Sequence, residues 1–316
     1  MRKIMAMIAL GAALYVGACD KRPQKLQVAV IPKGTTHVYW KSVEAGAEQA
    51  GKELGIEIIW KGPLKENDRS QQIAIVEQFV ADRVGAIVLA PLDDSALVTP
   101  VQEAAGAKIP VVIIDSALKG EAGKDFVSYI ATDNEKGGEL AGEKLVSLLG
   151  GKGKVVLLRY QEGSASTTER EAGFLGVIRK NPGMSVLVEN RFGGATANES
   201  QKEAMNMLDQ LKAADGVFCP NESSTFGMLL ALRQAGLAGK IKFVGFDVTP
   251  QLIDALKGGD IDALVAQDPV KMGYQGVKTA VAAARGQSVN RHIDTGVRII
   301  GKPDLSDPVI QKLIGQ

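Results

Sequence analysis

Cysteine, histidine and aromatic residues are scarce in this chain of 316 residues. It has two cysteines and two histidines, and its aromatic fraction is 5%. Two cysteines cannot build a disulfide framework, so the fold must depend on its hydrophobic core. The two histidines, His37 and His292, are far apart in the chain, which argues against a histidine-based metal cluster or catalytic triad.

Net charge is also nearly absent. Lysine and arginine number 37 and aspartate and glutamate 36, which gives a formal charge of +1. A nucleic-acid-binding protein needs a basic face, and this composition gives no sign of one. The sequence also lacks a P-loop, His-Glu-x-x-His, Cys-x-x-Cys, Gly-x-Ser-x-Gly, and a Gly-x-Gly-x-x-Gly after its first strand-like run. We therefore expect no enzyme, no metal and no cofactor, although an exported enzyme that uses carboxylates needs no such motif.

Residues 1–18 have the pattern of an export signal. A basic start is followed by an apolar run from Ile4 to Val16, which is too short for a comfortable membrane span. The segment Val-Gly-Ala-Cys that ends at Cys19 resembles the lipobox of bacterial lipoproteins, in which the cysteine is acylated. A plain secretory signal is the alternative interpretation.

Residues 19–25 are predicted to form a short polar tether after the lipid anchor. Asp20 resembles the inner-membrane retention signal of Gram-negative lipoproteins. The expected location is therefore the periplasm, anchored to the inner membrane, or the cell surface in a Gram-positive host.

Short apolar runs rich in β-branched residues recur along the rest of the chain, as expected for strands buried on both faces. They lie at 26–31, 56–60, 85–90, 110–115, 154–158, 185–189, 216–219, 242–246 and 262–267. Stretches with helical periodicity separate many of them, and this alternation predicts βαβ units and parallel sheets. One series occupies about 26–131 and a second begins near 154. The expected fold class is α/β, with two doubly wound parallel-sheet lobes; one large sheet is the alternative.

Polar and aromatic side chains follow the predicted strands. Ligands of doubly wound sheets bind beyond the carboxyl ends of the strands, so these positions are the candidate site. They are His37, Tyr39, Trp40, Asp93, Asp115, Thr132, Arg170, Asn221, Asp247 and Gln267. A structural role is the alternative for some of these residues, since Asp93 can cap a following helix. Thr36 can likewise cap the helix that carries Tyr39. Carboxylate, guanidinium and amide groups together suit a sugar or polyol, whose apolar C–H faces can lie on aromatic rings.

Several segments resemble the ribose-type periplasmic sugar-binding proteins. They are "AVIPKGTTHVYWKSVEAGA", "PVVIIDSALKG", "IATDNEKGGELAG", "STTEREAGF", "PNESSTFGMLLALRQAG", "VGFDVTP" and "AQDPVKMGYQGV", and they occur in the family's order. The resemblance covers essentially the whole chain after the signal. It implies two lobes joined by three crossover strands, which close on a sugar in the cleft between them and deliver it to the permease of an ATP-driven importer.

The resemblance also assigns residues. The family's stacking pair falls on Tyr39 and Trp40, and its polar site residues fall on Asp115, Arg170, Asn221, Asp247 and Gln267. His37 stands where the ribose binder has asparagine, Ala90 where it has asparagine, and Ser116 where it has arginine. Ser116 is thereby the eleventh candidate ligand-binding residue. These departures make another monosaccharide or a polyol at least as good a candidate as ribose.

The resemblance places the N-terminal lobe at 26–131 plus 268–295 and the C-terminal lobe at 132–267 plus 296–316. The expected protein is a monomeric sugar-binding lipoprotein that binds neither nucleic acid nor a cofactor. A chemosensory sugar sensor without import and an exported carbohydrate-modifying enzyme remain the alternatives. A sugar-responsive regulator of the same fold is disfavoured, because only an export signal precedes residue 26.

Overall fold

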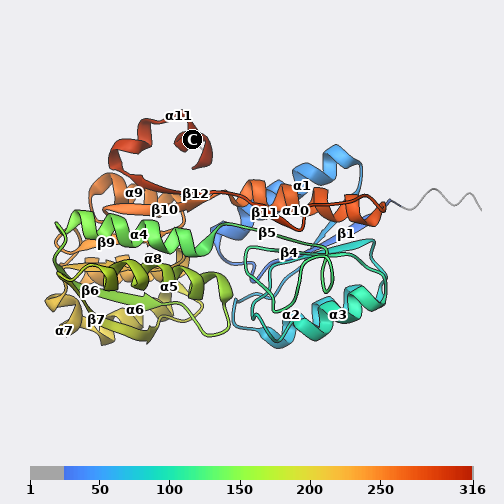
Figure 1. Cartoon of the computed structure of the whole chain (residues 1–316). Coiled ribbons are helices and arrows are strands. Elements are labelled where there is room, and N and C mark those ends of the chain that lie inside the picture. The colour runs from blue at the N-terminus through green and yellow to red at the C-terminus, as the bar shows by residue number, and fades with distance from the viewer. Residues whose placement is uncertain (1–24, 315–316) are drawn as a thin grey trace, which may run out of the picture.

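The computed structural model of the protein describes residues 25–314, which form two six-stranded sheets in two lobes (Figure 1). The predicted signal, Cys19, Asp20 and most of the tether lie outside the described residues. Among residues 25–314, no helix is both long and apolar enough to cross a membrane.

The first sheet has the strand order β11-β5-β4-β3-β1-β2, and all of its pairings are parallel. Its strands are β1 (Gln27–Ile31), β2 (Glu57–Trp60), β3 (Ala86–Leu89), β4 (Val111–Ile114), β5 (Ser128–Ala131) and β11 (His292–Asp294). The short β11 had no counterpart among the strands expected from sequence. At three residues, it is too short to give a periodic signal.

The second sheet repeats this topology as β12-β10-β9-β8-β6-β7. Its strands are β6 (Gly153–Arg159), β7 (Met184–Phe192), β8 (Gly216–Phe218), β9 (Lys242–Phe246), β10 (Ala263–Gln267) and β12 (Val297–Gly301). Only β12 is antiparallel to its neighbour. The two orders match position by position, so β4 corresponds to β9 and β5 to β10.

Helices cover both faces of each sheet. In the first lobe, α1 and α10 lie on one face and α2 and α3 on the other. In the second lobe, α4 and α5 lie on one face and α6 to α9 on the other. Their bounds are α1 (Val38–Leu54), α2 (Arg69–Ala81), α3 (Val98–Gly106), α4 (Asn134–Leu148), α5 (Ala165–Lys180), α6 (Ala197–Asn206), α7 (Leu208–Ala213), α8 (Glu222–Gln234), α9 (Pro250–Gly258) and α10 (Pro269–Ala284); a 3₁₀ turn (Lys302–Ser306) and α11 (Pro308–Leu313) end the described chain.

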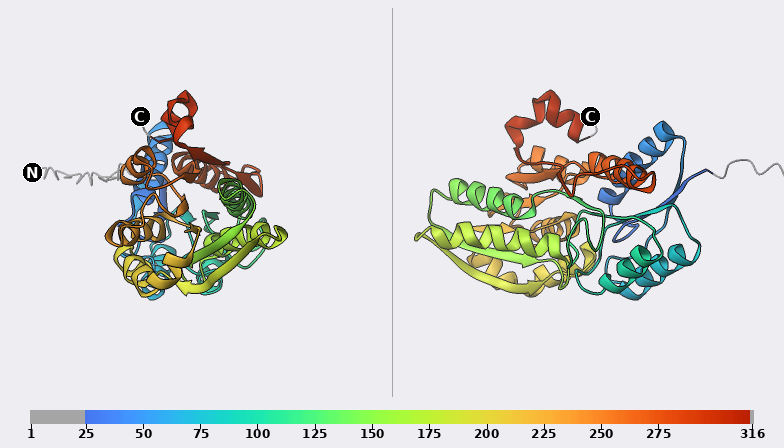
Figure 2. Two further views of the ribbon diagram at one scale, coloured as in Figure 1. Left: turned by 90° about the vertical axis from the view of Figure 1, so that its left-hand side faces the viewer. Right: turned by 45° about the vertical axis from the view of Figure 1, so that its right-hand side comes forward.

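The chain passes between the lobes three times. Strand β5 belongs to the first sheet, but α4, which follows it, packs against α5 in the second lobe. In the same way, β10 of the second sheet leads into α10, which packs on the first sheet, and β11 leads directly into β12. The connections run from one lobe to the other in Figure 1 and in the right-hand view of Figure 2. The predicted fold of two doubly wound lobes joined by three crossovers is confirmed.

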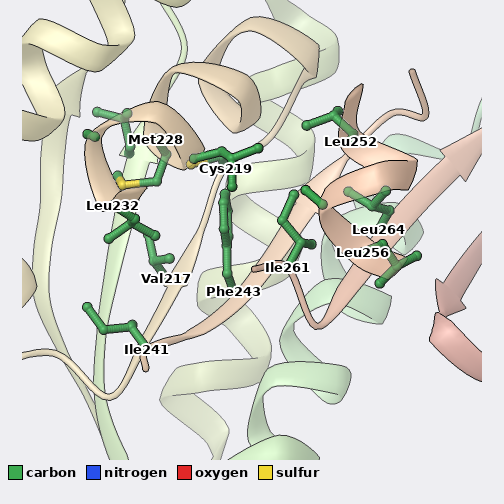
Figure 3. Packing of buried hydrophobic residues seen from close by; sticks show 14 of the residues in the cluster. Val217, Cys219, Met228, Leu232, Ile241, Phe243, Leu252, Leu256, Ile261 and Leu264 are labelled. Atoms are coloured by element: carbon green, nitrogen blue, oxygen red, sulfur yellow. The ribbon is translucent and has the colours of Figure 1, made fainter. Parts of the chain in front are cut away.

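Each lobe has its own hydrophobic core, made of two layers separated by the sheet. Figure 3 shows part of one layer of the second lobe, where Phe243 lies between side chains of neighbouring strands and helices. Cys219 belongs to this layer and is fully buried, as the sequence predicted for a structural thiol. Burial raises the pKa of its thiol, which makes it unreactive.

Helix α1 begins differently from the prediction. Its N-cap residue is His37, not Thr36, and the His37 side chain makes no capping hydrogen bond. The first turn also carries no acidic residue, so the segment itself supplies no acceptor for the free backbone N–H groups of this helix. The opposite end has the expected glycine stop, with Gly55 in the left-handed conformation at φ 66°.

Two helix pairs pack unusually closely, one in each lobe. A Cβ added to Gly46 of α1 would lie 2.0 Å from the carbonyl oxygen of Val270, and one added to Gly273 of α10 would lie 2.0 Å from that of Val43. Gly138 and Gly173 have the same role between α4 and α5 in the other lobe. The glycines let each crossing helix approach its new partner, which fixes the chain paths that join the lobes.

Candidate functional site

A cavity lies between the lobes at the carboxyl ends of both sheets. Its volume is about 30 Å³. Both lobes contribute to its lining, as the predicted cleft requires. The lining residues are Lys33, His37, Tyr39, Trp40, Glu66, Asp115, Tyr160, Ser166, Thr167, Arg170, Asn221, Glu222, Asp247 and Gln267.

Eight of the eleven ligand-binding residues expected from sequence line this cavity. The three that do not are Asp93, Ser116 and Thr132. Asp93 pairs with Arg69 at 2.7 Å and accepts hydrogen bonds from the backbone N–H groups of Ser95 and Ala96, in the turn before α3. It does not cap α3, whose N-cap residue is Leu97. The Ser116 hydroxyl accepts from the backbone N–H of Ser166 in the other lobe, and Thr132 lies at a crossover, 3.4 Å from the Thr295 hydroxyl.

On the first-lobe side, Asp115 connects two cavity residues. Its Oδ1 accepts a hydrogen bond from the Tyr39 hydroxyl at 2.9 Å, and its Oδ2 is 3.0 Å from Lys33 Nζ. Lys33 also donates to Ser166 Oγ across the cleft at 2.9 Å. Burial and the neighbouring Asp115 raise the pKa of Tyr39, so its hydroxyl keeps its proton and acts as the donor.

His37 and Glu66 form a buried ion pair beside this group. His37 Nδ1 is 2.7 Å from Glu66 Oε1, and Nε2 is 3.1 Å from the carbonyl oxygen of Ala195. Both partners are acceptors, so both ring nitrogens must carry protons and the ring is an imidazolium. Burial by itself would lower the pKa of His37, but the Glu66 carboxylate outweighs it and raises that pKa to about 9.

Glu66 accepts hydrogen bonds from both lobes. Its carboxylate also accepts from Trp40 Nε1 at 2.6 Å and, across the cleft, from the Tyr160 hydroxyl at 2.7 Å. Burial would raise its pKa, but the positive charges of His37 and Lys33 and the Trp40 hydrogen bond lower it to about 2. Trp40 is only 2% exposed and packs into the first-lobe core, with its ring nearly perpendicular to that of Tyr39. It therefore presents little ring area to the cavity.

On the second-lobe side, Arg170 is the centre of a buried hydrogen-bond chain. It is 3% exposed and donates to the Asn134 side chain, the Pro220 carbonyl and Gln267 Oε1, each at 2.9 to 3.0 Å. Gln267 in turn donates to Asp247 Oδ1 at 2.6 Å. The Arg170 guanidinium also lies over the Phe246 ring, 3.9 Å from its centroid. Three of the five guanidinium N–H groups are thus bound by protein acceptors, which fixes the position of the side chain.

Glu222 was missed by sequence reasoning, as were Lys33, Glu66, Tyr160, Ser166 and Thr167. Lys33 and Tyr160 follow the carboxyl ends of β1 and β6, so the strand-end rule that found Asp115 could have found them. Glu66 lies in a loop after an edge strand, with no local pattern to mark it. In the sequence, Glu222 is an ordinary acidic residue in a first helical turn. No local pattern predicts its partner in the other lobe.

Two buried ion pairs line the cavity. Lys33 pairs with Asp115, and His37 with Glu66. Because the Lys33 ammonium is bound to a carboxylate, it is not a base for the neighbouring Ser166 hydroxyl. Within residues 25–314, no group of His, Cys, Asp and Glu is arranged to hold a metal ion. The lining therefore offers carboxylate, amide and guanidinium groups that can hydrogen-bond a polar molecule.

Two lobes with one binding cavity between them define a solute-binding protein. The chain belongs to the periplasmic binding protein family, because the family model "periplasmic binding protein domain" matches residues 28–288. It is 30% identical over 315 residues to the D-ribose/D-allose-binding protein of Pseudomonas aeruginosa, covering 96% of this chain and 98% of that one. It is 27% identical to the ribose import binding protein of Escherichia coli, over 95% and 97% of the two chains.

Solved structures give the same result. A carbohydrate transporter solute-binding protein from Agrobacterium radiobacter, in complex with D-arabinose, is 35% identical with a TM-score of 0.88, over 92% of this chain and 99% of that one. A solute-binding protein from Agrobacterium vitis, bound to α-D-tagatopyranose, is 34% identical with a TM-score of 0.86 over the same shares. These relatives are substrate-binding proteins of transporters, so the chain is a binding protein and not an enzyme.

Proposed function

We propose that this protein captures a neutral monosaccharide or polyol outside the cytoplasm and delivers it to the permease of an ATP-driven sugar importer. The observation that carries the proposal is the pair of facing polar groups, with Asp115 and Tyr39 on one lobe and Arg170, Gln267 and Asp247 on the other. Carboxylate and amide oxygens accept from hydroxyl groups, and the amide and guanidinium N–H groups donate to them. The sugars named for the relatives support the same ligand class.

Capture is proposed to proceed by closure of the lobes. A cavity of about 30 Å³ has room for about two water molecules, at about 10–15 Å³ for each, and not for a sugar to enter. The lobes must therefore separate for entry, and a ligand that touches both of them favours the closed form. The residues proposed to contact it are the eight predicted ones that line the cavity. A contact of the ligand with any of the three other expected residues stays a prediction, because they lie outside the cavity lining. They are Asp93, Ser116 and Thr132.

We further propose that the first lobe comprises 26–131 with 268–295 and the second 132–267 with 296–316. The membership of β11 and β12 in different sheets supports a boundary between 294 and 297. Lipid attachment at Cys19, retention by Asp20 and a monomeric state are also proposals. Mass spectrometry of the mature protein tests the first, and an unmodified Cys19 would remove the anchor.

A thermal-shift screen over pentoses, hexoses and polyols tests the binding function, because a ligand that binds only the folded state raises apparent stability. The expected result is a shift with a small set of related sugars that are recovered chemically unchanged. Chemical turnover of a sugar, or no shift with any of them, would contradict the proposal. Scattering profiles with and without a saturating sugar test closure, and identical profiles would refute it.

A further inference from the structure

Glu222 of the second lobe makes its side-chain contacts with the first lobe. Its carboxylate accepts hydrogen bonds from the backbone N–H groups of Val38 and Tyr39, at 3.1 and 2.8 Å. These are the first two residues of α1. Helix α1 has no side-chain cap and no acidic residue in its first turn, so the acceptor for these N–H groups comes from the opposite side of the cleft.

The chemistry of this contact is favourable. Free N–H groups at a helix N-terminus carry partial positive charge and bind anionic acceptors, here a partly buried carboxylate. Burial raises the pKa of Glu222, and the negative charge of Asp247 adds to this. The His37 imidazolium and the two N–H donors of α1 act in the opposite direction and favour the charged form. When the lobes separate, α1 loses this acceptor while Glu222 regains water.

Glu222 is also joined to the binding residues of its own lobe. Its backbone N–H donates to Asp247 Oδ2 at 2.8 Å, and Asn221, which lines the cavity, precedes it. A side chain that bridges the lobes is thus attached to the groups proposed to hold the sugar. Closure and the placement of Asp247 are coupled through one residue.

We propose that Glu222 is a closure residue, which caps α1 across the cleft and stabilises the closed form whether or not a ligand is bound. It rests on the lobe motion proposed above, but not on the identity of the ligand. The contact involves only protein groups, so it shifts the intrinsic open–closed equilibrium. Apparent affinity then depends on the fraction of molecules that are already closed.

Two variants remove this contact from its two sides. Glu222→Gln removes the charge and keeps the size of the side chain. Val38→Pro removes one of the two N–H donors. Proline is favoured at the first position of a helix. His37, the residue before it, already has the extended backbone that a following proline requires, with φ −80° and ψ 146°. Val38 is 42% exposed, so its loss costs little packing. Glu48→Gln, on the exposed surface of α1, is the matched control.

The experiment measures the distance between spin labels on the outer faces of the two lobes in ligand-free protein. Wild type and Glu48→Gln are expected to show the same closed population. In Glu222→Gln, the ratio of closed to open molecules should fall about tenfold, in line with the loss of a charged hydrogen bond. Val38→Pro should fall between them. Unchanged distributions in Glu222→Gln and Val38→Pro, with normal thermal unfolding, would overturn the proposal.

A sugar that binds the wild type gives an independent measurement. Its dissociation constant should rise in the order wild type, Val38→Pro, Glu222→Gln, with the largest increase up to about tenfold. If saturating sugar leaves the wild-type distances unchanged, the proposed closure itself fails. If sugar closes the wild type but the ligand-free variants match it, only the role of Glu222 fails.

Discussion

Asp115 and Asp247 occupy equivalent positions in the two lobes and face one cavity. Asp115 follows β4 and Asp247 follows β9, each the third strand of its sheet in the matching orders. Both have a left-handed backbone, with φ 65° and 71°, which is uncommon for residues other than glycine and is tolerated best by aspartate and asparagine. The repeat of architecture thus presents two carboxylates to the ligand in the same local geometry.

This geometry predicts different results for different replacements of Asp247. Asp247→Asn should fold normally, because asparagine accepts the left-handed backbone, but it should weaken sugar binding at least tenfold by loss of the charged acceptor. Asp247→Ala should lose binding and also about 1 kcal/mol or more of stability from backbone strain. Urea unfolding and calorimetry separate the two effects. Equal stability of the alanine and asparagine variants would show that the backbone is not strained.

Arg170 should be sensitive even to lysine. Arg170→Lys cannot serve the three acceptors that the guanidinium holds, nor stack on Phe246. We expect unfolding free energy to fall by about 2–4 kcal/mol and sugar binding to be lost. Arg179→Lys, in the exposed part of the same helix, is the control and should change stability by less than about 0.5 kcal/mol. Wild-type binding in Arg170→Lys would place the ligand elsewhere.

The His37–Glu66 pair predicts a pH window for stability. The folded pKa of His37 is raised to about 9, so its contribution is complete below its ordinary value near 6.5 and is lost as the pH rises through 9. The folded pKa of Glu66 is lowered to about 2, so its contribution is complete above its ordinary value near 4.5 and is lost as the pH falls through 2. Stability should therefore be greatest between about pH 4.5 and 6.5.

The variant His37→Gln tests this window. Between pH 5 and 9.5, the stability of wild type measured by thermal unfolding should decline with rising pH. This decline should be smaller in His37→Gln, by an amount on the order of 2–3 kcal/mol at most. His292→Gln is the control, since His292 lies in an exposed strand away from the cavity. A wild-type decline that persists in His37→Gln would assign it to another group.

The close contact of α1 and α10 predicts that Gly46 tolerates no side chain. Gly46→Ala would place a methyl group against the backbone carbonyl of Val270, and should cost about 1–3 kcal/mol. Gly176→Ala is the control: this position in α5 has no atom within 4 Å of an added Cβ, so alanine should stabilise by about 0.5–1 kcal/mol. Chemical unfolding measures both. A neutral Gly46→Ala would show that the helices can move apart freely.

The regular part of the fold could be predicted from sequence because it depends on local patterns. The strand 242–246 was predicted with its observed bounds, and Gly55 ended α1 as expected. Asp115, Arg170 and Gln267 were placed correctly around one cavity by a single rule, that parallel strands bring their carboxyl ends together. The same rule did not bring Asp93 into the cavity lining, because Asp93 pairs with Arg69 and accepts a hydrogen bond from Ala96 in the turn before α3.

What the sequence alone determined about this protein is therefore its lobes, its strand ends and the polar character of its cleft. Only the tertiary structure decided how those groups are satisfied. Trp40 lies mainly in the core, His37 is charged because it lies between two acceptors, and Glu222 caps a helix in the other lobe. The physical reason is that each of these states depends on a partner brought in from a distant part of the chain, and local periodicity carries no information about such partners.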